Sequence, residues 1–200
     1  MDKTYSYDDV LLIPQYSDIR SRSEIDISTD LGKGVILQLP IFASPMDTIS
    51  EGSMSNAMGM VGASAIVHRY NTIQEQMNEV NKVESPRIVG AAIGITGDYL
   101  ERASALVDHG ADFLCVDVAH GHHIMMKEAL HKLRKLFGDD YHLMAGNVAT
   151  LKGINDLADW GADSVRCNIG GGSICSTRIQ TGHGLPGLQT IIECAKTDRD

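Results

Sequence analysis

The densest group of residues able to do chemistry is the segment Gly170-Gly-Gly-Ser-Ile-Cys-Ser-Thr-Arg178. Three consecutive glycines let the backbone approach a ligand closely, and the Ser173 hydroxyl adds a donor beside exposed N–H groups. These features predict a phosphate cradle, although a Gly-rich segment is also typical of a tight turn. Cys175 follows it, and a thiol among N–H donors near Arg178 is a candidate nucleophile. The alternative role for Cys175 is that of a small buried hydrophobe.

Two further groups of polar residues follow apolar runs. Asp117 ends one such run, and its carboxylate needs partners, which would be either a helix N-terminus or a polar group of a ligand. A histidine cluster comes shortly after it, in the order His120, His122 and His123. The cluster has no carboxylate in helical register and matches catalytic zinc patterns poorly, so we do not expect it to bind a metal.

The elements that would position these residues form a repeating pattern of strand and helix. Apolar, β-branched-rich runs predict strands at Val35–Ser44, Ala63–His68, Arg87–Gly94, Asp112–Ala119, His142–Val148 and Asp163–Ile169. Amphipathic patterns predict helices at Glu51–Met60, Ile73–Val83, Tyr99–His109, Ile124–Phe137, Leu151–Trp160 and Leu188–Lys196. Several of the strands are continuous apolar runs, which is typical of a parallel sheet covered on both faces.

Successive βα units with short loops predict a TIM-type (β/α)8 barrel, with an open doubly wound sheet as the alternative. A complete barrel has eight units in about 250 residues. We therefore expect residues 1–200 to be the N-terminal portion of a single barrel domain, with the first six units present and the C-terminal units missing. Because barrel enzymes carry their sites at the C-terminal ends of the strands, the polar residues that follow the predicted strands should share one rim.

The composition argues against several classes of partner. A formal net charge of −9 disfavours binding to nucleic acid or anionic membranes, which needs clustered Lys and Arg. No apolar run reaches the roughly 18 residues that would span a membrane. Four widely spaced cysteines without a CxxC pair, and a start without a signal peptide, predict reduced thiols in the cytoplasm. The negative charge does not exclude a small phosphate-bearing ligand, because backbone N–H groups can bind a phosphate locally.

Five motifs together resemble the IMP dehydrogenase/GMP reductase family, and the resemblance runs from Tyr7 to the end of the chain. The motifs are Ser-Pro-Met-Asp-Thr (44–48), Gly-Ala-Ala-Ile-Gly (90–94), Asp-Val-Ala-His-Gly-His (117–122), Ala-Gly-Asn-Val-Ala-Thr (145–150) and Gly-Ser-Ile-Cys-Ser-Thr-Arg (172–178). The resemblance implies a purine nucleoside monophosphate as substrate, a nicotinamide cofactor and a homotetramer of the full-length protein.

The resemblance also implies roles for individual residues. Cys175 would attack C2 of IMP, hydride would pass to NAD, and water positioned by Thr177 would hydrolyse the thioimidate to XMP. The residues matching the nucleotide site are Ser44, Met46, Asn147, Gly172 and Ser173, and those on the cofactor side are Asp117, Ala119 and His120. The family's potassium site would correspond to the backbone carbonyls of Gly170, Gly172 and Cys175.

Two other functions stay open. A GMP reductase would release ammonia from GMP and take hydride from NADPH, and a truncated chain would be an inactive nucleotide-binding module. We favour the dehydrogenase because the motifs at 44–48 and 90–98 look more like that branch, and we expect residues 1–200 alone to be inactive. No pair of cystathionine-synthase-type regulatory domains interrupts the segment between His68 and Arg87. Asn168 and Gly171 depart from the family's usual Gly and Pro or Ser, which puts the stiffness and the cation affinity of the loop in question.

Overall fold

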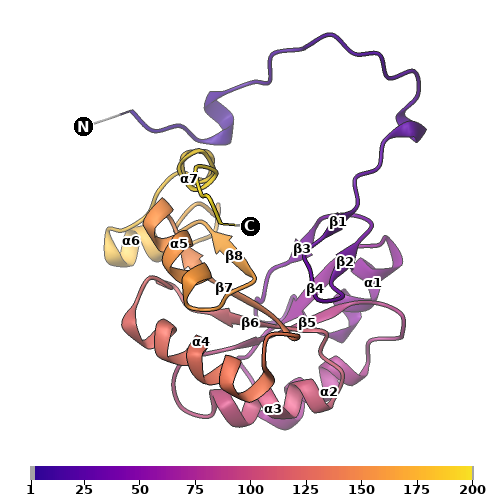
Figure 1. Ribbon diagram of the computed structural model, residues 1–200, viewed down its shortest axis with the longest axis vertical. Coiled ribbons are helices and arrows are strands. Elements are labelled where there is room, and N and C mark those ends of the chain that lie inside the picture. The colour runs from indigo at the N-terminus through magenta and orange to yellow at the C-terminus, as the bar shows by residue number, and fades with distance from the viewer. Residues whose placement is uncertain (1–2, 200) are drawn as a thin grey trace.

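The computed structural model describes residues 3–199, and its framework is a curled parallel sheet with helices on the outside (Figure 1). The sheet has six strands in the order β3-β4-β5-β6-β7-β8. The strands are β3 (Phe42–Ala43), β4 (Ser64–Val67), β5 (Val89–Ile93), β6 (Phe113–Asp117), β7 (His142–Val148) and β8 (Ser164–Cys167). This order follows the chain without reversal, whereas a doubly wound sheet reverses at a switch point. The structure is therefore an α/β half-barrel, consistent with a TIM-barrel-like fold.

The helices connect and follow the strands close to their predicted positions. They are α1 (Gly52–Met60), α2 (Ile73–Asn81), α3 (Tyr99–Asp108), α4 (Ile124–Phe137), α5 (Leu151–Asp159), α6 (Thr177–Thr181) and α7 (Gly187–Cys194). Side-chain caps start three of them, since the Thr72 hydroxyl accepts from the Glu75 N–H, the Thr150 hydroxyl accepts from the Gly153 N–H, and the His123 ring accepts from the N–H of the second residue of α4. The six predicted helices and the last five predicted strands are confirmed, with bounds that differ by no more than two residues.

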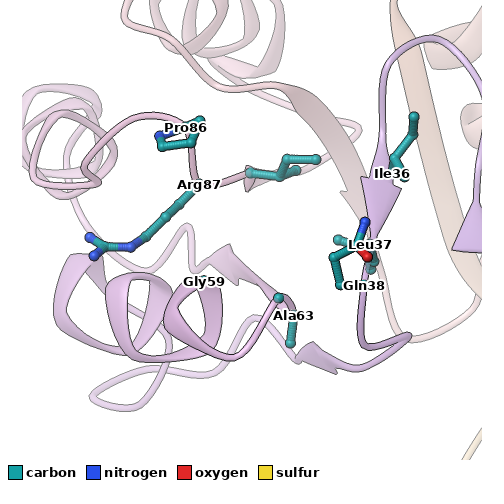
Figure 2. Close-up of a pocket in the computed structure, with 9 residues that line it drawn as sticks. Ile36, Leu37, Gln38, Gly59, Ala63, Pro86 and Arg87 are labelled. Carbon is teal, nitrogen blue, oxygen red and sulfur yellow. The ribbon is translucent and has the colours of Figure 1, made fainter. Parts of the chain in front are cut away.

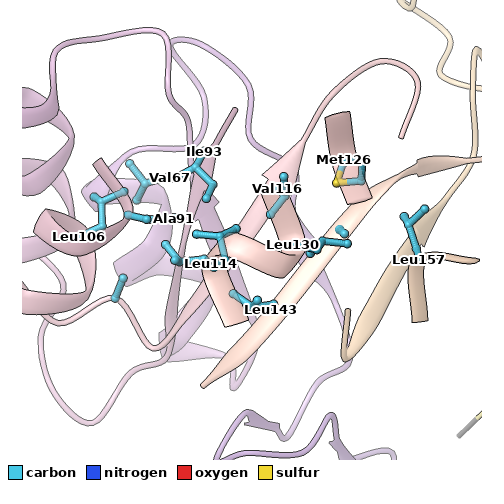
Figure 3. Packing of buried hydrophobic residues seen from close by; sticks show 14 of the residues in the cluster. Val67, Ala91, Ile93, Leu106, Leu114, Val116, Met126, Leu130, Leu143 and Leu157 are labelled. Carbon is cyan, nitrogen blue, oxygen red and sulfur yellow. The ribbon is translucent and has the colours of Figure 1, made fainter. Parts of the chain in front are cut away.

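Both faces of the sheet are buried, which explains the continuous apolar runs of its strands. Leu114 and Val116 of β6 point outward and join the cluster beneath the helices, together with Leu130 of α4 (Figure 3). Phe113 and Cys115 of the same strand belong to a second cluster. Because successive side chains of a strand point to opposite faces, this second cluster lines the inside of the curl.

The first predicted strand, Val35–Ser44, is wrong as a single element. Its beginning forms β2 (Ile36–Leu37), which pairs antiparallel with β1 (Thr29–Asp30), and only its end forms β3 in the parallel sheet. Pro40 lies between the two pieces, where its ring removes a ladder donor and fixes φ. The helix α6 and two short 3-10 turns, Tyr7–Asp9 and Arg22–Glu24, were not predicted from the sequence.

The turn between β1 and β2 ties the hairpin to the far side of the sheet. The Lys33 ammonium lies 2.5 Å from the Asp163 carboxylate, which precedes β8. Arg134 of α4 pairs with the same carboxylate, and the Leu143 N–H donates to it at 2.7 Å. These contacts hold the hairpin across the N-terminal ends of the strands and leave the C-terminal ends for other loops. Within residues 3–199, none of the helices has the length and hydropathy that crossing a membrane requires.

Candidate active site

The loops at the C-terminal ends of the strands enclose a cavity of about 490 Å³ around the thiol of Cys175. Loops from opposite parts of the sheet contribute to it, because parallel strands bring their C-terminal ends to one rim. The cavity is lined by Ser44, Ala119, Asn147, Arg166, Cys167, Asn168, Ile169, Gly170, Gly171, Gly172, Cys175 and Thr177. The predicted shared rim is thus confirmed for loops that are up to 133 positions apart in the chain.

Most of the predicted site residues meet at this cavity, but not all of them do. Those that line it are Ser44, Ala119, Asn147, Gly170, Gly172, Cys175 and Thr177. His120 lines a neighbouring cavity of about 560 Å³, which shares Ala119, Ile169 and Thr177 with the first. Met46 and Ser173 are exposed residues of the surrounding loops and do not line either cavity.

The cysteine loop holds the Cys175 thiol in a polar setting. Its backbone N–H donates to the Gly172 carbonyl at 3.1 Å, which closes a tight turn just before α6. Its Sγ lies 3.2 Å from the Thr177 Oγ1. Hydrogen bonds from the Thr177 hydroxyl and N–H, together with the nearby Arg178 charge, lower the pKa of the Cys175 thiol. The alternative role of Cys175 as a buried hydrophobe does not fit this half-buried, hydrogen-bonded position.

Asp117 has a partner that neither expectation for it included. Its Oδ1 accepts from the Arg166 guanidinium at 2.5 Å and from the Asn147 side-chain amide at 3.2 Å. The carboxylate therefore pairs with a charge on β8 and does not cap a helix. Arg166 also reaches toward Ser44, with Nη2 3.4 Å from Oγ. Arg166 lines the cavity, and this ion pair with its two further contacts joins the ends of four strands, β3, β6, β7 and β8.

Sequence reasoning missed Arg166, although a signal for it was present. It interrupts the run Ser164-Val-Arg-Cys167, which otherwise reads as a buried strand. An arginine in a covered strand requires a buried partner or a polar cavity, because an unpaired charge is costly to desolvate. Its inner-face position at a strand end could have marked it as a site residue.

The two departures from the family pattern, Asn168 and Gly171, lie against each other. A Cβ added to Gly171 would come within 2.4 Å of the Asn168 side-chain amide, so a side chain at 171 would require the Asn168 side chain to shift. Asn168 Oδ1 is buried and has no hydrogen-bond partner among residues 3–199. The glycine at 171 thus leaves room for the side chain of Asn168.

The histidine cluster is divided among separate local contacts. His122 Nε2 lies 2.7 Å from Asp156 Oδ2 of α5. His123 accepts from the Met125 N–H at 3.2 Å and so caps α4. Across residues 3–199, no three His, Cys, Asp or Glu side chains converge in a group that would hold a metal ion.

A second region of the molecule, at the N-terminal ends of the strands, also contains a cavity of about 380 Å³ (Figure 2). Its lining is mainly small and apolar: Ile36, Leu37, Gln38, Gly59, Gly62, Ala63, Pro86, Arg87 and Ile88. The Arg87 guanidinium is already engaged, since it donates to Asn56 and Glu84 at 2.7 Å each. This cavity offers no nucleophile, so the groups able to do covalent chemistry lie at the Cys175 end.

Comparisons with known proteins agree with this geometry. The profile of the IMP dehydrogenase / GMP reductase domain matches residues 4–200. The chain is 29% identical to the inosine-5'-monophosphate dehydrogenase of Nitrosopumilus maritimus, with 98% of this chain and 67% of the relative covered. It is 32% identical to the GMP reductase of Mycoplasma mycoides, with 98% and 62% covered.

A solved structure extends the likeness to three dimensions. The crystal structure of inosine 5' monophosphate dehydrogenase from Legionella pneumophila superposes with a TM-score of 0.91 at 44% identity, covering 99% of this chain and 61% of that one. The chain thus spans roughly three fifths to two thirds of the length of these relatives. Since the profile matches nearly every residue, the chain belongs to the IMP dehydrogenase/GMP reductase family.

Proposed function

We propose that this chain carries the nucleotide-binding and nucleophilic part of an IMP dehydrogenase, which oxidises IMP to XMP with NAD through a covalent thioimidate on Cys175. The observation that supports it most is the Cys175 thiol itself, with its lowered pKa, at the mouth of a cavity formed by strand-end loops. The relative with the highest identity reported above, at 44%, is also an IMP dehydrogenase.

The chemistry follows from the position of the thiol. The Cys175 thiolate would add to C2 of IMP and form a C–S bond, and the C2 hydrogen would leave with its electron pair as hydride. The nicotinamide of NAD, when bound, supplies the acceptor for this hydride. Water would then add to C2 of the thioimidate, release XMP and return the thiol. The lowered pKa favours the first step, because the thiolate is the nucleophilic form.

Neighbouring residues have positions that suit supporting roles. Thr177 Oγ1, at 3.2 Å from the sulfur, would hold the attacking water near C2. Ser44 and Asn147 line the cavity from other strands and would contact the nucleotide. Met46 and Ser173 are exposed in the surrounding loops. Both would contact the nucleotide, and the Ser173 hydroxyl and the Gly172 N–H would donate to its phosphate.

The cofactor would lie toward Ala119 and His120, which line the adjoining cavity of about 560 Å³. The lining of this cavity is largely apolar at Ala149, Ile169 and Leu185, as a flat nicotinamide ring requires. Asp117 belongs to the same strand end, but its carboxylate already accepts from Arg166. Its proposed contact with the nicotinamide riboside would therefore use the oxygen that Arg166 and Asn147 leave free. Of the two nicotinamide cofactors, NAD and NADP, the proposed one is NAD.

A potassium ion on the carbonyls of Gly170, Gly172 and Cys175 fits the loop. Oxygen-only ligation suits a weakly bound cation, and the loop already contains one buried oxygen without a partner, Asn168 Oδ1. These three carbonyls would hold the ion, and its contribution would be to order the cysteine loop around the thiol.

The remaining features of the whole protein follow from the same proposal. Two further βα units would close the half-barrel, and the longer protein would be a cytoplasmic homotetramer. The alignment with the Nitrosopumilus enzyme runs over 320 residues although this chain has 200, so that relative contains residues that this chain lacks. In this chain the segment between His68 and Arg87 is short and contains only α2 as a regular element, which supports a barrel without an inserted regulatory domain at that place.

GMP reductase is the second candidate, and one observation favours it. The chain is 32% identical to the Mycoplasma GMP reductase and 29% identical to the Nitrosopumilus dehydrogenase. In that reaction the Cys175 thiolate would add to C2 of GMP and expel ammonia, and hydride from NADPH would then convert the same thioimidate to IMP.

The two candidates can be distinguished by the requirements for the Cys175 adduct. Loss of hydride from IMP needs an oxidised cofactor, whereas loss of ammonia from GMP does not. Because residues 1–200 alone are expected to be inactive, the test uses a longer protein in which two further βα units complete the barrel. In that protein we expect intact-protein mass spectrometry to detect a purine nucleotide on Cys175 after incubation with IMP plus NAD⁺, and no adduct with the Cys175→Ser variant. An adduct formed from GMP alone would instead identify a reductase. No adduct from either nucleotide, with no protection of Cys175 from iodoacetamide, would refute both.

A further inference from the structure

Two cysteines outside the Gly170–Arg178 loop lie against each other between β8 and α7. On β8, Cys167 belongs to the face that packs against the outer apolar cluster. On α7, Thr190 and Cys194 are the buried residues, and their spacing of four places them on one face of the helix. The helix packs on β8 (Figure 1), and the Cys167 and Cys194 thiols share a side-chain hydrogen bond.

Contacts at both ends of α7 keep this pair of thiols together. Before the helix, the Leu185 N–H donates to the Ile169 carbonyl at 3.0 Å. After it, the Thr197 hydroxyl donates to the side-chain oxygen of Asn155 on α5 at 2.6 Å. Because α7 is held on each side, the two sulfurs meet in the folded chain at a high effective concentration.

The two thiols differ in access and agree in protonation. Cys167 is half-buried and lines the cavity around Cys175, whereas Cys194 is buried. Burial raises the pKa of Cys167 to about 12, and it also raises the pKa of Cys194. Both thiols are therefore protonated at neutral pH, which makes their reactions slow. No stabilised thiolate opposes a disulfide between them, however, so the equilibrium depends on their proximity.

We propose that Cys167 and Cys194 form a reversible disulfide between β8 and α7, with a low-molecular-weight disulfide such as oxidised glutathione as the oxidant. The Cys167 thiolate attacks one sulfur of oxidised glutathione, whose S–S bond breaks and releases one glutathione thiolate. The Cys194 thiolate then attacks the Cys167 sulfur of the mixed disulfide and expels the second glutathione. The two cysteines lose two electrons and two protons, and the oxidant becomes two thiols.

The disulfide closes a loop that contains the whole cysteine segment. This loop runs from residue 167 to residue 194 and includes Gly170–Arg178 and α6. A cross-link restricts the chain that it closes, so oxidation fixes both ends of the segment and prevents α7 from opening away from β8. The inference does not rest on which reaction Cys175 carries out, because both thiols lie outside that loop.

The test equilibrates the longer protein, with its barrel completed, in mixtures of reduced and oxidised glutathione. The Cys175→Ser background is used because trypsin leaves residues 167–178 as one peptide, which would otherwise contain two cysteines. After free thiols are blocked with N-ethylmaleimide, mass spectrometry should detect this peptide linked to residues 179–196, which contain Cys194. We expect the link to form at a glutathione ratio at least about tenfold more reducing in the folded protein than in concentrated urea.

Matched variants and a second measurement check the position of the link. Cys194→Ser should abolish the linked peptide, whereas Cys115→Ser, at a buried thiol on β6, should leave it unchanged. Oxidation should also slow hydrogen exchange in α7 about tenfold, because the helix can no longer open from the strand. The Cys194→Ser variant should show no such slowing.

Several results would overturn the inference. One is a Cys167 that carries only glutathione at the most oxidising ratio, and another is a linked peptide that forms no more readily in the folded protein than in urea. Unchanged exchange in α7 after complete oxidation would also overturn it. If Cys194→Ser does not fold, Cys194→Ala replaces it, and the comparison with urea decides without either variant. The Cys175→Ser background forms no nucleotide adduct, so the disulfide is measured whether or not the enzyme proposal holds.

Discussion

The cysteine loop and the strands of the sheet shift the pKa of a cysteine thiol in opposite directions. In the loop, hydrogen bonds from Thr177 lower the pKa of the Cys175 thiol. In β6 and β8, burial raises the pKa of Cys115 and of Cys167 to about 12. Both strand thiols lie close to the cavity or beneath it, so distance from the site does not explain the difference. The surroundings of each sulfur explain it, because burial disfavours the thiolate at Cys115 and Cys167, whereas the Thr177 hydroxyl and N–H stabilise the thiolate at Cys175.

The contrast between the loop thiol and the strand thiols is tested most directly by their alkylation rates. At pH 8 we expect iodoacetamide to modify Cys175 roughly a thousandfold faster than Cys115, because a thiol with a pKa of about 12 has about 10⁻⁴ of its molecules as thiolate. The Cys175 rate should rise with pH and reach its plateau at a lower pH than free cysteine does. Peptide mass spectrometry over time measures both rates, and Cys175→Ser is the control. Equal rates for the two thiols would contradict the contrast.

A change in the strand region should affect stability and leave the loop's reactivity intact. Leu114→Ala on β6 removes a fully buried side chain from the cluster under the helices and should cost about 2–5 kcal/mol of unfolding free energy. Urea titration followed by circular dichroism measures this loss. The Cys175 alkylation rate of the folded protein should stay within about twofold of wild type. A large fall in that rate would mean that the loop's geometry depends directly on the core.

The paired residues Asn168 and Gly171 should show strong coupling. Gly171→Ser alone forces its new side chain against the Asn168 amide and should destabilise the protein by about 1–3 kcal/mol. Asn168→Gly provides the matched background, in which the same Gly171→Ser change should cost much less. A double-mutant cycle on unfolding free energy measures the interaction. Additive effects would show that the two departures from the family pattern are independent.

The smallest expected effect concerns the hydroxyl beside the thiol. Thr177→Val keeps the shape of the side chain but removes the hydroxyl that lies 3.2 Å from Sγ, so the pKa of Cys175 should rise. Loss of one hydrogen bond of about 0.5–1.5 kcal/mol predicts alkylation at pH 7 slowed by about 2–10-fold. Thr181→Val, one turn along α6, is the control, since its hydroxyl bonds the Thr177 carbonyl instead. An unchanged pH profile for Thr177→Val would assign the lowered pKa to the backbone alone.

Local sequence patterns predicted most of the helices and strands at their observed positions. The apolar run at His142–Val148 and the amphipathic stretch at Ile124–Phe137 each became an element with unchanged bounds. The run at Val35–Ser44 failed because pairing partners, which lie elsewhere in the chain, decide whether a short extended segment joins a hairpin or a sheet. The five-residue α6 was missed because so short a helix has too few residues to show a period.

The sequence by itself determined the family of this protein and predicted Cys175 as its nucleophile, because the motif around Cys175 and the order of strand and helix are set by neighbouring residues. Only the tertiary structure decided which residues support that nucleophile's surroundings. The Asp117–Arg166 pair, its hydrogen bond from Asn147 and the approach of Arg166 to Ser44 all depend on where distant segments meet. A parallel sheet makes this unavoidable, since every neighbour of a strand end is brought there by a crossover connection of a dozen or more residues.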